Sequence, residues 1–325
     1  MRHFRYLVNV FVIILTTQTL KGDPNENYLG KLPCFRYLSD REQENNISRA
    51  AAPFAIAAEH VYSRRLKDKT YEPIPFPHTK NEDWAQLEFC VSQQDEKLGF
   101  YAEAWIRNSS LGKQLVIAFR GTQFAEIPDW SRGNLTMFRC FPWRTQFDAA
   151  LDYAARVTLK DRTLPVVFTG HSLGGGLAEY CQRYTPNSRA IVFHPSPNQG
   201  RLFGIGSNQK KYDKHVLRLF ERGELLRPFR WLLGSWHKTA IDGNVSGVKG
   251  RWIDFRTGNP LTQHYMTTYT IDIVRQAALA NDESAKSVLD QIANERDRKG
   301  KSVERWWHQV QAHKTLQAPA HALQP

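Results

Sequence analysis

Hydrophobic and polar positions change their period several times along the chain, and each change predicts a different kind of element. An Ala-rich stretch from residue 50 to about residue 66, capped by Ser48, carries apolar residues at helical spacing. Between residues 84 and 120, apolar and polar residues alternate instead, with a turn at residues 108–112. This region predicts three short strands that form a meander.

Farther along, short apolar runs alternate with stretches of helical spacing. The runs cover residues 165–169, 190–193 and 216–220, and helical faces begin at Phe147, Leu173 and Met266. Strands that alternate with helices are typical of a mostly parallel sheet with helices on both faces. The sequence therefore predicts an α/β fold, with one domain over residues 48–280.

The two ends of the chain differ from this domain. Residues 1–20 have a positive start and an apolar run too short to span a bilayer, which is the pattern of a signal peptide. That pattern predicts a secreted, periplasmic or otherwise extracytoplasmic protein. Because the cleavage motif is poor, a protein anchored in the membrane through this segment is the alternative. A polar linker is expected over residues 21–47, and a basic, partly helical tail over residues 281–325.

Charge suggests a partner. The chain has 44 Lys and Arg against 32 Asp and Glu, a net charge of +12. The excess is concentrated between residues 201 and 256, with twelve basic and five acidic residues. Such a face attracts anionic partners. No nucleic-acid-binding motif accompanies it, so an anionic membrane surface is the expected partner and nucleic acid is not; solubility alone is the alternative explanation.

The four cysteines, Cys34, Cys90, Cys140 and Cys181, leave two interpretations open. In an exported protein they fit two disulfides, in any of three pairings. Alternatively, Cys90 in a strand and Cys181 in a helix are small buried apolar residues. No Cys-x-x-Cys pair is present, so neither a structural metal site nor a cofactor is expected.

The clearest chemical signal is Gly170-His-Ser172-Leu-Gly174, between a predicted strand and a predicted helix. This is the context of a nucleophile elbow, where the turn is so sharp that side chains at both glycine positions would collide with neighbouring elements. Ser172 would be held in a strained backbone conformation with its hydroxyl above the sheet edge. Gly175 and Gly176 would let the helix lie close to the sheet. The alternative is a glycine-rich turn with a surface serine.

A serine nucleophile needs a base, an acid that orients the base, and donors for the oxyanion. In this architecture the base and acid follow the serine along the chain. His264, at a loop-to-helix junction, is the predicted base. His194, directly after a strand, is the second choice, and His215 and His237 are the other downstream candidates. His171 is expected to point into the fold.

Glu224 is the predicted acid, because it lies just past the C-terminal end of the strand at residues 216–220. It would fix the tautomer of the imidazole and stabilise the imidazolium without taking the proton itself. Glu221 and Asp213 flank the same strand and remain alternatives.

These motifs resemble those of the class 3 lipase family of α/β-hydrolases. The matching segments are Val116-Ile-Ala-Phe-Arg-Gly-Thr122, Asp129-Trp130, Gln146-Phe147, Gly170-His-Ser-Leu-Gly-Gly175, Arg218-Leu-Phe-Glu-Arg-Gly-Glu224-Leu-Leu226 and His264. The resemblance implies Ser172 as nucleophile, His264 as base, and an oxyanion hole formed by the backbone N–H groups of Thr122 and Leu173. The family usually has aspartate where this chain has Glu224. Independently, Thr122 closes a predicted strand, so its N–H can point to a developing oxyanion.

The expected function is hydrolysis of lipid or phospholipid esters at an interface through an acyl-enzyme. Residues 123–146 carry many large apolar side chains beside the predicted site, which suggests a lid or an acyl-chain groove, although buried packing also explains such residues. Two alternatives stay open. One is a catalytically silent hydrolase-fold protein that only binds, and the other is a lipolytic toxin or effector that acts on membranes.

Overall fold

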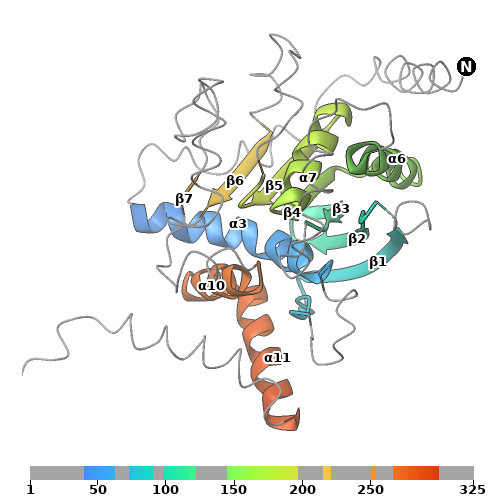
Figure 1. The fold of residues 1–325 in the computed structure, drawn as a ribbon. Coiled ribbons are helices and arrows are strands. Elements are labelled where there is room, and N and C mark those ends of the chain that lie inside the picture. The colour runs from blue at the N-terminus through green and yellow to red at the C-terminus, as the bar shows by residue number, and fades with distance from the viewer. Residues whose placement is uncertain are drawn as a thin grey trace, which may run out of the picture.

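The computed structural model describes residues 40–62, 73–90, 98–121, 145–196, 215–220, 251–252 and 266–299. Within these ranges seven strands form one sheet, and helices cover both of its faces (Figure 1). The strands are β1 (Glu82–Cys90), β2 (Ala102–Ser109), β3 (Gly112–Phe119), β4 (Val166–His171), β5 (Ser188–Phe193), β6 (Val216–Phe220) and β7 (Arg251–Trp252). The helices are α3 (Asp40–His60), α6 (Gln146–Thr158), α7 (Leu173–Tyr184), α10 (Met266–Leu279) and α11 (Glu283–Lys299).

The sheet has an antiparallel part and a parallel part. Strands β1, β2 and β3 pair antiparallel as a meander, and the turn between β2 and β3 closes with Ser109 opposite Gly112. From β3 onward each strand pairs in parallel with the next, through β4, β5 and β6 to β7. The prediction of an α/β fold with a mostly parallel sheet is confirmed.

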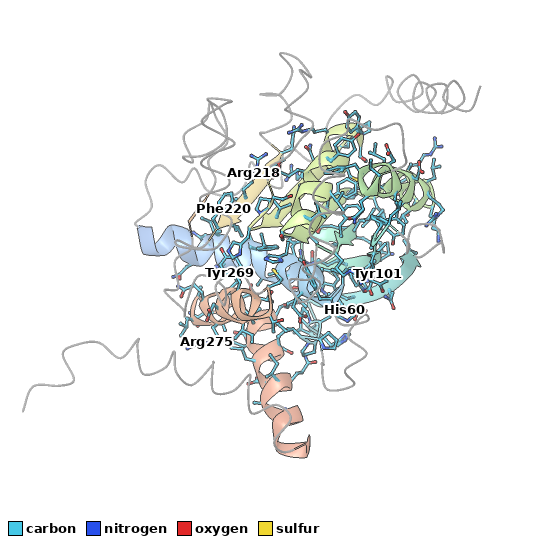
Figure 2. All side chains as sticks on the ribbon, in the orientation of Figure 1. His60, Tyr101, Arg218, Phe220, Tyr269 and Arg275 are labelled. Atoms are coloured by element: carbon cyan, nitrogen blue, oxygen red, sulfur yellow. The ribbon has the colours of Figure 1, made fainter. Side chains whose placement is uncertain are left out.

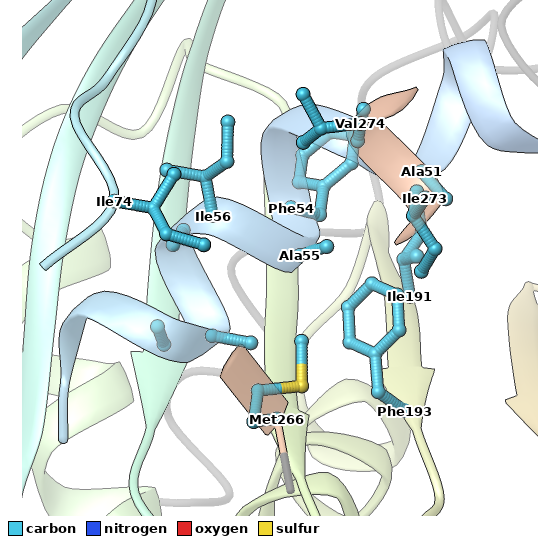
Figure 3. Close-up of a cluster of buried hydrophobic side chains, with 14 of the residues drawn as sticks. Ala51, Phe54, Ala55, Ile56, Ile74, Ile191, Phe193, Met266, Ile273 and Val274 are labelled. Atoms are coloured by element: carbon cyan, nitrogen blue, oxygen red, sulfur yellow. The ribbon is translucent and has the colours of Figure 1, made fainter. Parts of the chain in front are cut away.

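Alternating side chains divide the buried sheet between two apolar layers. In β3, Val116 and Ala118 join the layer under α3, α10 and α11, which Figure 3 shows in part. Leu115, Ile117 and Phe119 on the other face join the layer under α6 and α7. Because both faces are covered, the central strands are continuous apolar runs, as expected for parallel strands.

Several element boundaries match the sequence pattern. Helices α7 and α10 and strand β6 begin where the apolar spacing predicts, and Met266, Tyr269 and Ile273 are all buried on one face of α10. Thr145 caps α6 in a capping box with Asp148, which fixes where that helix begins.

Other boundaries differ from the prediction. Helix α3 begins at Asp40 and ends at His60, so Ser48 lies inside the helix and residues 40–47 belong to it rather than to the predicted linker. Its first turns are mostly charged and polar, so no apolar period marks them. Asn45 nevertheless accepts a hydrogen bond from Gln276 of α10 at 2.5 Å, and Ile47 is buried. Tertiary contacts therefore extend the helix beyond its apolar stripe.

Three further findings concern the edges of the fold. A register shift between Gln86 and Glu88 leaves Leu87 37% exposed, although the alternation predicts a regular strand there. Strand β7 has only two residues, so no alternation of apolar and polar residues could have predicted it. Helix α11 of the predicted tail packs on α10 and buries Ala285, Val288 and Ile292 in the core.

Cys181 is a buried cysteine outside any disulfide, in agreement with its interpretation as a small apolar residue. Cys34 and Cys140 lie outside the described residues, as do the predicted signal segment at residues 1–20 and most of the linker. In the part of the chain that the structure describes, every helix is too short or too polar to cross a bilayer.

Candidate active site

Ser172 occupies the turn between strand β4 and helix α7. Its backbone has φ of 56° and ψ of −123°, a conformation that non-glycine residues rarely adopt. Its amide donates to the carbonyl of Phe193 at 3.0 Å, and its own carbonyl accepts from Ser196 at 2.9 Å. Its side chain makes no capping hydrogen bond to α7. Strand β5 and the segment after it therefore hold the strained backbone, while the hydroxyl does not cap the helix.

The glycines on either side of Ser172 are required by space. A Cβ at Gly170 would lie 2.5 Å from the carbonyl oxygen of Gly174 and 2.8 Å from that of Phe119. A Cβ at Gly174 would collide with the backbone of Phe119 and Arg120. A side chain at either position would thus clash with α7 or with strand β3. These are the clashes that the sequence predicts for a nucleophile elbow.

Gly175 and Gly176 have a related but different role. A Cβ at Gly175 would lie 2.9 Å from Pro195 Cβ, and one at Gly176 would lie 2.6 Å from the hydroxyl oxygen of Ser196. Both glycines thus bring α7 close to the segment that follows β5. A Cβ at Gly175 would also lie 3.2 Å from the Gly170 carbonyl oxygen of β4, so this glycine lets α7 lie close to the sheet as predicted.

Two histidines lie buried at this edge of the sheet. His171 is 4% exposed and its Nδ1 lies 3.1 Å from the Tyr62 hydroxyl oxygen, so it points into the fold as expected. His194 is fully buried with φ of 43°, and its ring centroid lies 5.6 Å from that of His171 and 4.3 Å from that of Tyr269. Its surroundings are those of a packed core side chain.

The structure describes only part of the predicted site. Ser172, Leu173, Gly170 and Gly174 come together at the turn, with Leu173 as the first residue of α7. Thr122, Glu224 and His264 lie outside the described residues, as do the alternatives Asp213, Glu221 and His237. His215, the remaining candidate base, lies one residue before β6, whose parallel pairing places it at the opposite edge of the sheet from Ser172.

The described elements nevertheless lead toward one edge. Phe119, the last residue of β3, pairs with Gly170 of β4, so β3 ends beside the Ser172 turn. Leu219 near the end of β6 accepts a hydrogen bond from the His194 amide at 2.8 Å. Strand β6 therefore ends at the same edge of the sheet.

An ion pair joins helix α7 to β6. Arg218 Nε and Nη2 donate to the two carboxylate oxygens of Glu179 at 2.7 and 2.6 Å, and both side chains are largely buried. Figure 2 labels Arg218 on β6. Bidentate Arg–carboxylate pairs fix geometry as well as contributing energy. This pair therefore holds α7 against the strand that precedes the candidate acid.

Two polar residues near the end of α3 were missed by the sequence analysis. Glu59 is fully buried and accepts hydrogen bonds from the Ile74 amide at 3.1 Å and the Thr267 hydroxyl at 3.4 Å. Burial raises its pKa from 4.5 to about 8, although both hydrogen bonds oppose the rise. Tyr62 reaches both Gly121 and His171. Neither Glu59 nor Tyr62 lies in a motif. Their hydrogen bonds join segments that are apart in the sequence, so no local pattern predicts the roles of these two residues.

Among the described residues, no three His, Cys, Asp or Glu side chains gather as the ligands of a metal ion would.

Comparison with known proteins agrees with this geometry. Residues 53–196 match the family model of the Tle-like phospholipase domain, and the matched segment contains Ser172 and both elbow glycines. The match supports a phospholipase-like hydrolase. No curated protein matches the chain.

Two solved structures show weak similarity. A mutant form of MDLA from Penicillium cyclopium has 17% identity and a TM-score of 0.34, over 70% of this chain and 97% of that one. A predicted CIB-like hydrolase from Thermoplasma acidophilum has 15% identity and a TM-score of 0.31, over 62% of this chain and 100% of that one. Both TM-scores are too low to support an argument about this chain.

Proposed function

We propose that this chain is a serine ester hydrolase of the α/β-hydrolase type that cleaves lipid esters, as a lipase or a phospholipase. The observation that carries the proposal is the backbone of Ser172, with φ of 56° and ψ of −123° at a strand-to-helix turn. Such a conformation costs about 1–3 kcal/mol and persists where its surroundings impose it, often at active sites. The flanking glycines make room for this turn and have no other evident use.

In the proposed mechanism, Ser172 Oγ attacks the ester carbonyl while His264 takes its proton. The oxyanion accepts hydrogen bonds from the backbone N–H groups of Leu173 and Thr122, and Glu224 orients the imidazole. The alcohol leaves with the proton from His264, and water then hydrolyses the acyl-enzyme by the same steps. The position of Leu173 at the start of α7 supports its part, because the first N–H groups of a helix have no partner within it.

Lipid esters are the proposed substrates for three reasons. The family model that matches residues 53–196 is that of a phospholipase domain. The motifs resemble those of class 3 lipases, and the net charge of +12 favours an anionic lipid surface. An apolar segment at residues 7–15 supports export or membrane anchoring. We therefore propose an extracytoplasmic enzyme that acts at a membrane surface.

The direct test is hydrolysis of esters of increasing acyl-chain length and of phospholipids with different head groups, with wild type and Ser172→Ala. We expect hydrolysis of lipid esters by wild type and a loss of about 10⁴-fold or more in the variant, as for other serine triads. Labelling of Ser172 by a fluorophosphonate, located by mass spectrometry, provides a second readout. Equal rates for the two proteins would refute the nucleophile. No hydrolysis by a folded wild-type protein would favour the catalytically silent alternative.

The base and the acid need separate variants. His264→Ala should reduce kcat about as strongly as Ser172→Ala, because the groups of a triad act as a unit. Glu224→Gln should reduce kcat strongly, whereas the matched variants Glu221→Gln and Asp213→Asn should retain it. An unchanged rate in Glu224→Gln together with a loss in either matched variant would move the acid to that residue.

A further inference from the structure

Tyr62 lies just beyond the end of α3, and its hydroxyl lies between two segments of the candidate active site. The Gly121 amide donates to the Tyr62 oxygen at 3.0 Å. The same oxygen lies 3.1 Å from His171 Nδ1, and the hydroxyl donates to the His171 carbonyl at 3.4 Å. Gly121 directly precedes Thr122, and His171 directly precedes Ser172.

Strand pairing does not join these two positions. The β3–β4 ladder ends with Phe119 opposite Gly170, and the Arg120 amide turns away to the carbonyl of Tyr101. Beyond that point the Tyr62 hydroxyl bridges the segment that leads into the predicted oxyanion donor and the segment that leads into the nucleophile. The bridge reaches across 109 positions of sequence to His171.

Local space is shaped for this bridge. A Cβ at Gly121 would lie 2.6 Å from the Tyr62 oxygen and 2.5 Å from the His171 carbonyl oxygen. Only glycine at position 121 therefore lets the hydroxyl and the two backbone segments approach so closely. The sequence Phe-Arg-Gly-Thr has its glycine at the point of closest approach.

The Tyr62 hydroxyl can make all three of these hydrogen bonds at once. Burial raises the pKa of Tyr62 above its usual value, so the phenol keeps its proton across the pH range of any ester assay. A tyrosine hydroxyl offers one proton and two acceptor sites. We assign His171 the tautomer with its proton on Nδ1, so that Gly121 and His171 both donate to the oxygen while the hydroxyl donates to the His171 carbonyl.

We infer that Tyr62 is a positioning residue, which fixes the distance between the N–H groups of the oxyanion hole and the Ser172 nucleophile. The inference rests on the proposed function. An oxyanion hole works only when its donors lie at hydrogen-bonding distance from the place where charge develops. Without the bridge, the buried Gly121 amide would lose its hydrogen-bond acceptor, and the segments that precede Thr122 and Ser172 would no longer be joined through the Tyr62 hydroxyl.

The test compares Tyr62→Phe with wild type under saturating substrate. We expect kcat to fall about 10- to 100-fold with little change in KM, because a displacement of about 1 Å in a catalytic group costs about 100-fold in rate. Tyr101→Phe is the matched control, since it removes a buried tyrosine hydroxyl that donates to Glu103, two residues farther along in β2, at 2.5 Å. This control should lose stability but keep kcat.

The outcomes separate positioning from a merely structural role. The inference would be overturned if Tyr62→Phe melted at a lower temperature but kept the kcat of wild type when assayed well below its melting temperature. If Tyr62→Phe does not fold, 3-fluorotyrosine at position 62 keeps the ring and hydroxyl but weakens the oxygen as an acceptor, and an unchanged kcat there would also overturn it. Ser172→Ala in the same assay keeps the two proposals distinct. Its full activity would refute the proposed function, whereas an inactive Ser172→Ala beside a fully active Tyr62→Phe would refute this inference alone.

Discussion

Replacing Glu59 by glutamine should remove a pH dependence from the stability of the folded protein. Glu59 lies in α3 with no exposure to water, between the Ile74 amide and the Thr267 hydroxyl of α10. Desolvation raises its pKa to about 8 from 4.5. Glutamine has nearly the same shape, can accept from the Ile74 amide, and never ionises.

The magnitude follows from the two pKa values. The unfolded chain releases the proton of Glu59 as pH rises through 4.5, whereas the folded chain keeps it until about pH 8. Between those values the unfolded state binds fewer protons, so the free energy of unfolding decreases as pH rises. At about 1.4 kcal/mol per tenfold change in proton affinity, the loss is about 1 kcal/mol at pH 5, about 3 kcal/mol at pH 6.5 and about 4 kcal/mol at pH 8.

The assay is urea denaturation of wild type and Glu59→Gln at pH 5, 6.5 and 8. The difference in unfolding free energy between the two proteins should change by about 3 kcal/mol from pH 5 to pH 8, in favour of the variant at the higher pH. Glu283→Gln is the control for the loss of one carboxylate, because Glu283 on α11 has a side chain 75% exposed. Parallel curves for wild type and Glu59→Gln would refute a buried, protonated Glu59.

Two further predictions concern the elements around the elbow. Gly174→Ala should lower stability by about 1–3 kcal/mol and reduce ester hydrolysis strongly, because its Cβ meets backbone atoms of Phe119 and Arg120. In Gly176→Ala the new Cβ closely meets only the rotatable hydroxyl of Ser196, so stability and ester hydrolysis should change little. If thermal melts and rate assays showed the same losses for Gly176→Ala as for Gly174→Ala, the steric argument would be contradicted. Arg218→Met should cost about 3–5 kcal/mol in urea denaturation by removing the Arg218 partner of the buried Glu179 carboxylate. Adding Glu179→Gln should recover part of that loss, and strictly additive losses would show that the pair is not coupled.

The parts of the fold that could be predicted are those with a local signal. Apolar runs bounded by turn residues predicted β4, β5 and β6, and helical spacing predicted α7 and α10. The elbow was also predictable, because the glycines at 170 and 174 are demanded by clashes that the backbone path itself creates. In each case the residues that determine the structure lie within the element or beside it.

The parts that could not be predicted depend on contacts between distant segments. The polar first turns of α3 are held by α10, where Gln276 bonds to Asn45 across 231 positions. Glu59 and Tyr62 likewise gain their roles only when the end of α3 meets Ile74, Thr267, Gly121 and His171.

The end of α3 therefore links the two halves of the proposed site. Through Glu59 it contacts Thr267, three positions after the predicted base His264, and through Tyr62 it contacts the residues before Thr122 and Ser172. A motif can identify a nucleophile because the chemistry needs those residues in a short turn. The groups that hold the nucleophile, the oxyanion donors and the base at fixed distances are free to come from anywhere in the chain. In the proposed site, the Tyr62 and Glu59 contacts come from a helix end more than 100 positions before Ser172, where one partly buried tyrosine and one buried glutamate leave no repeating pattern.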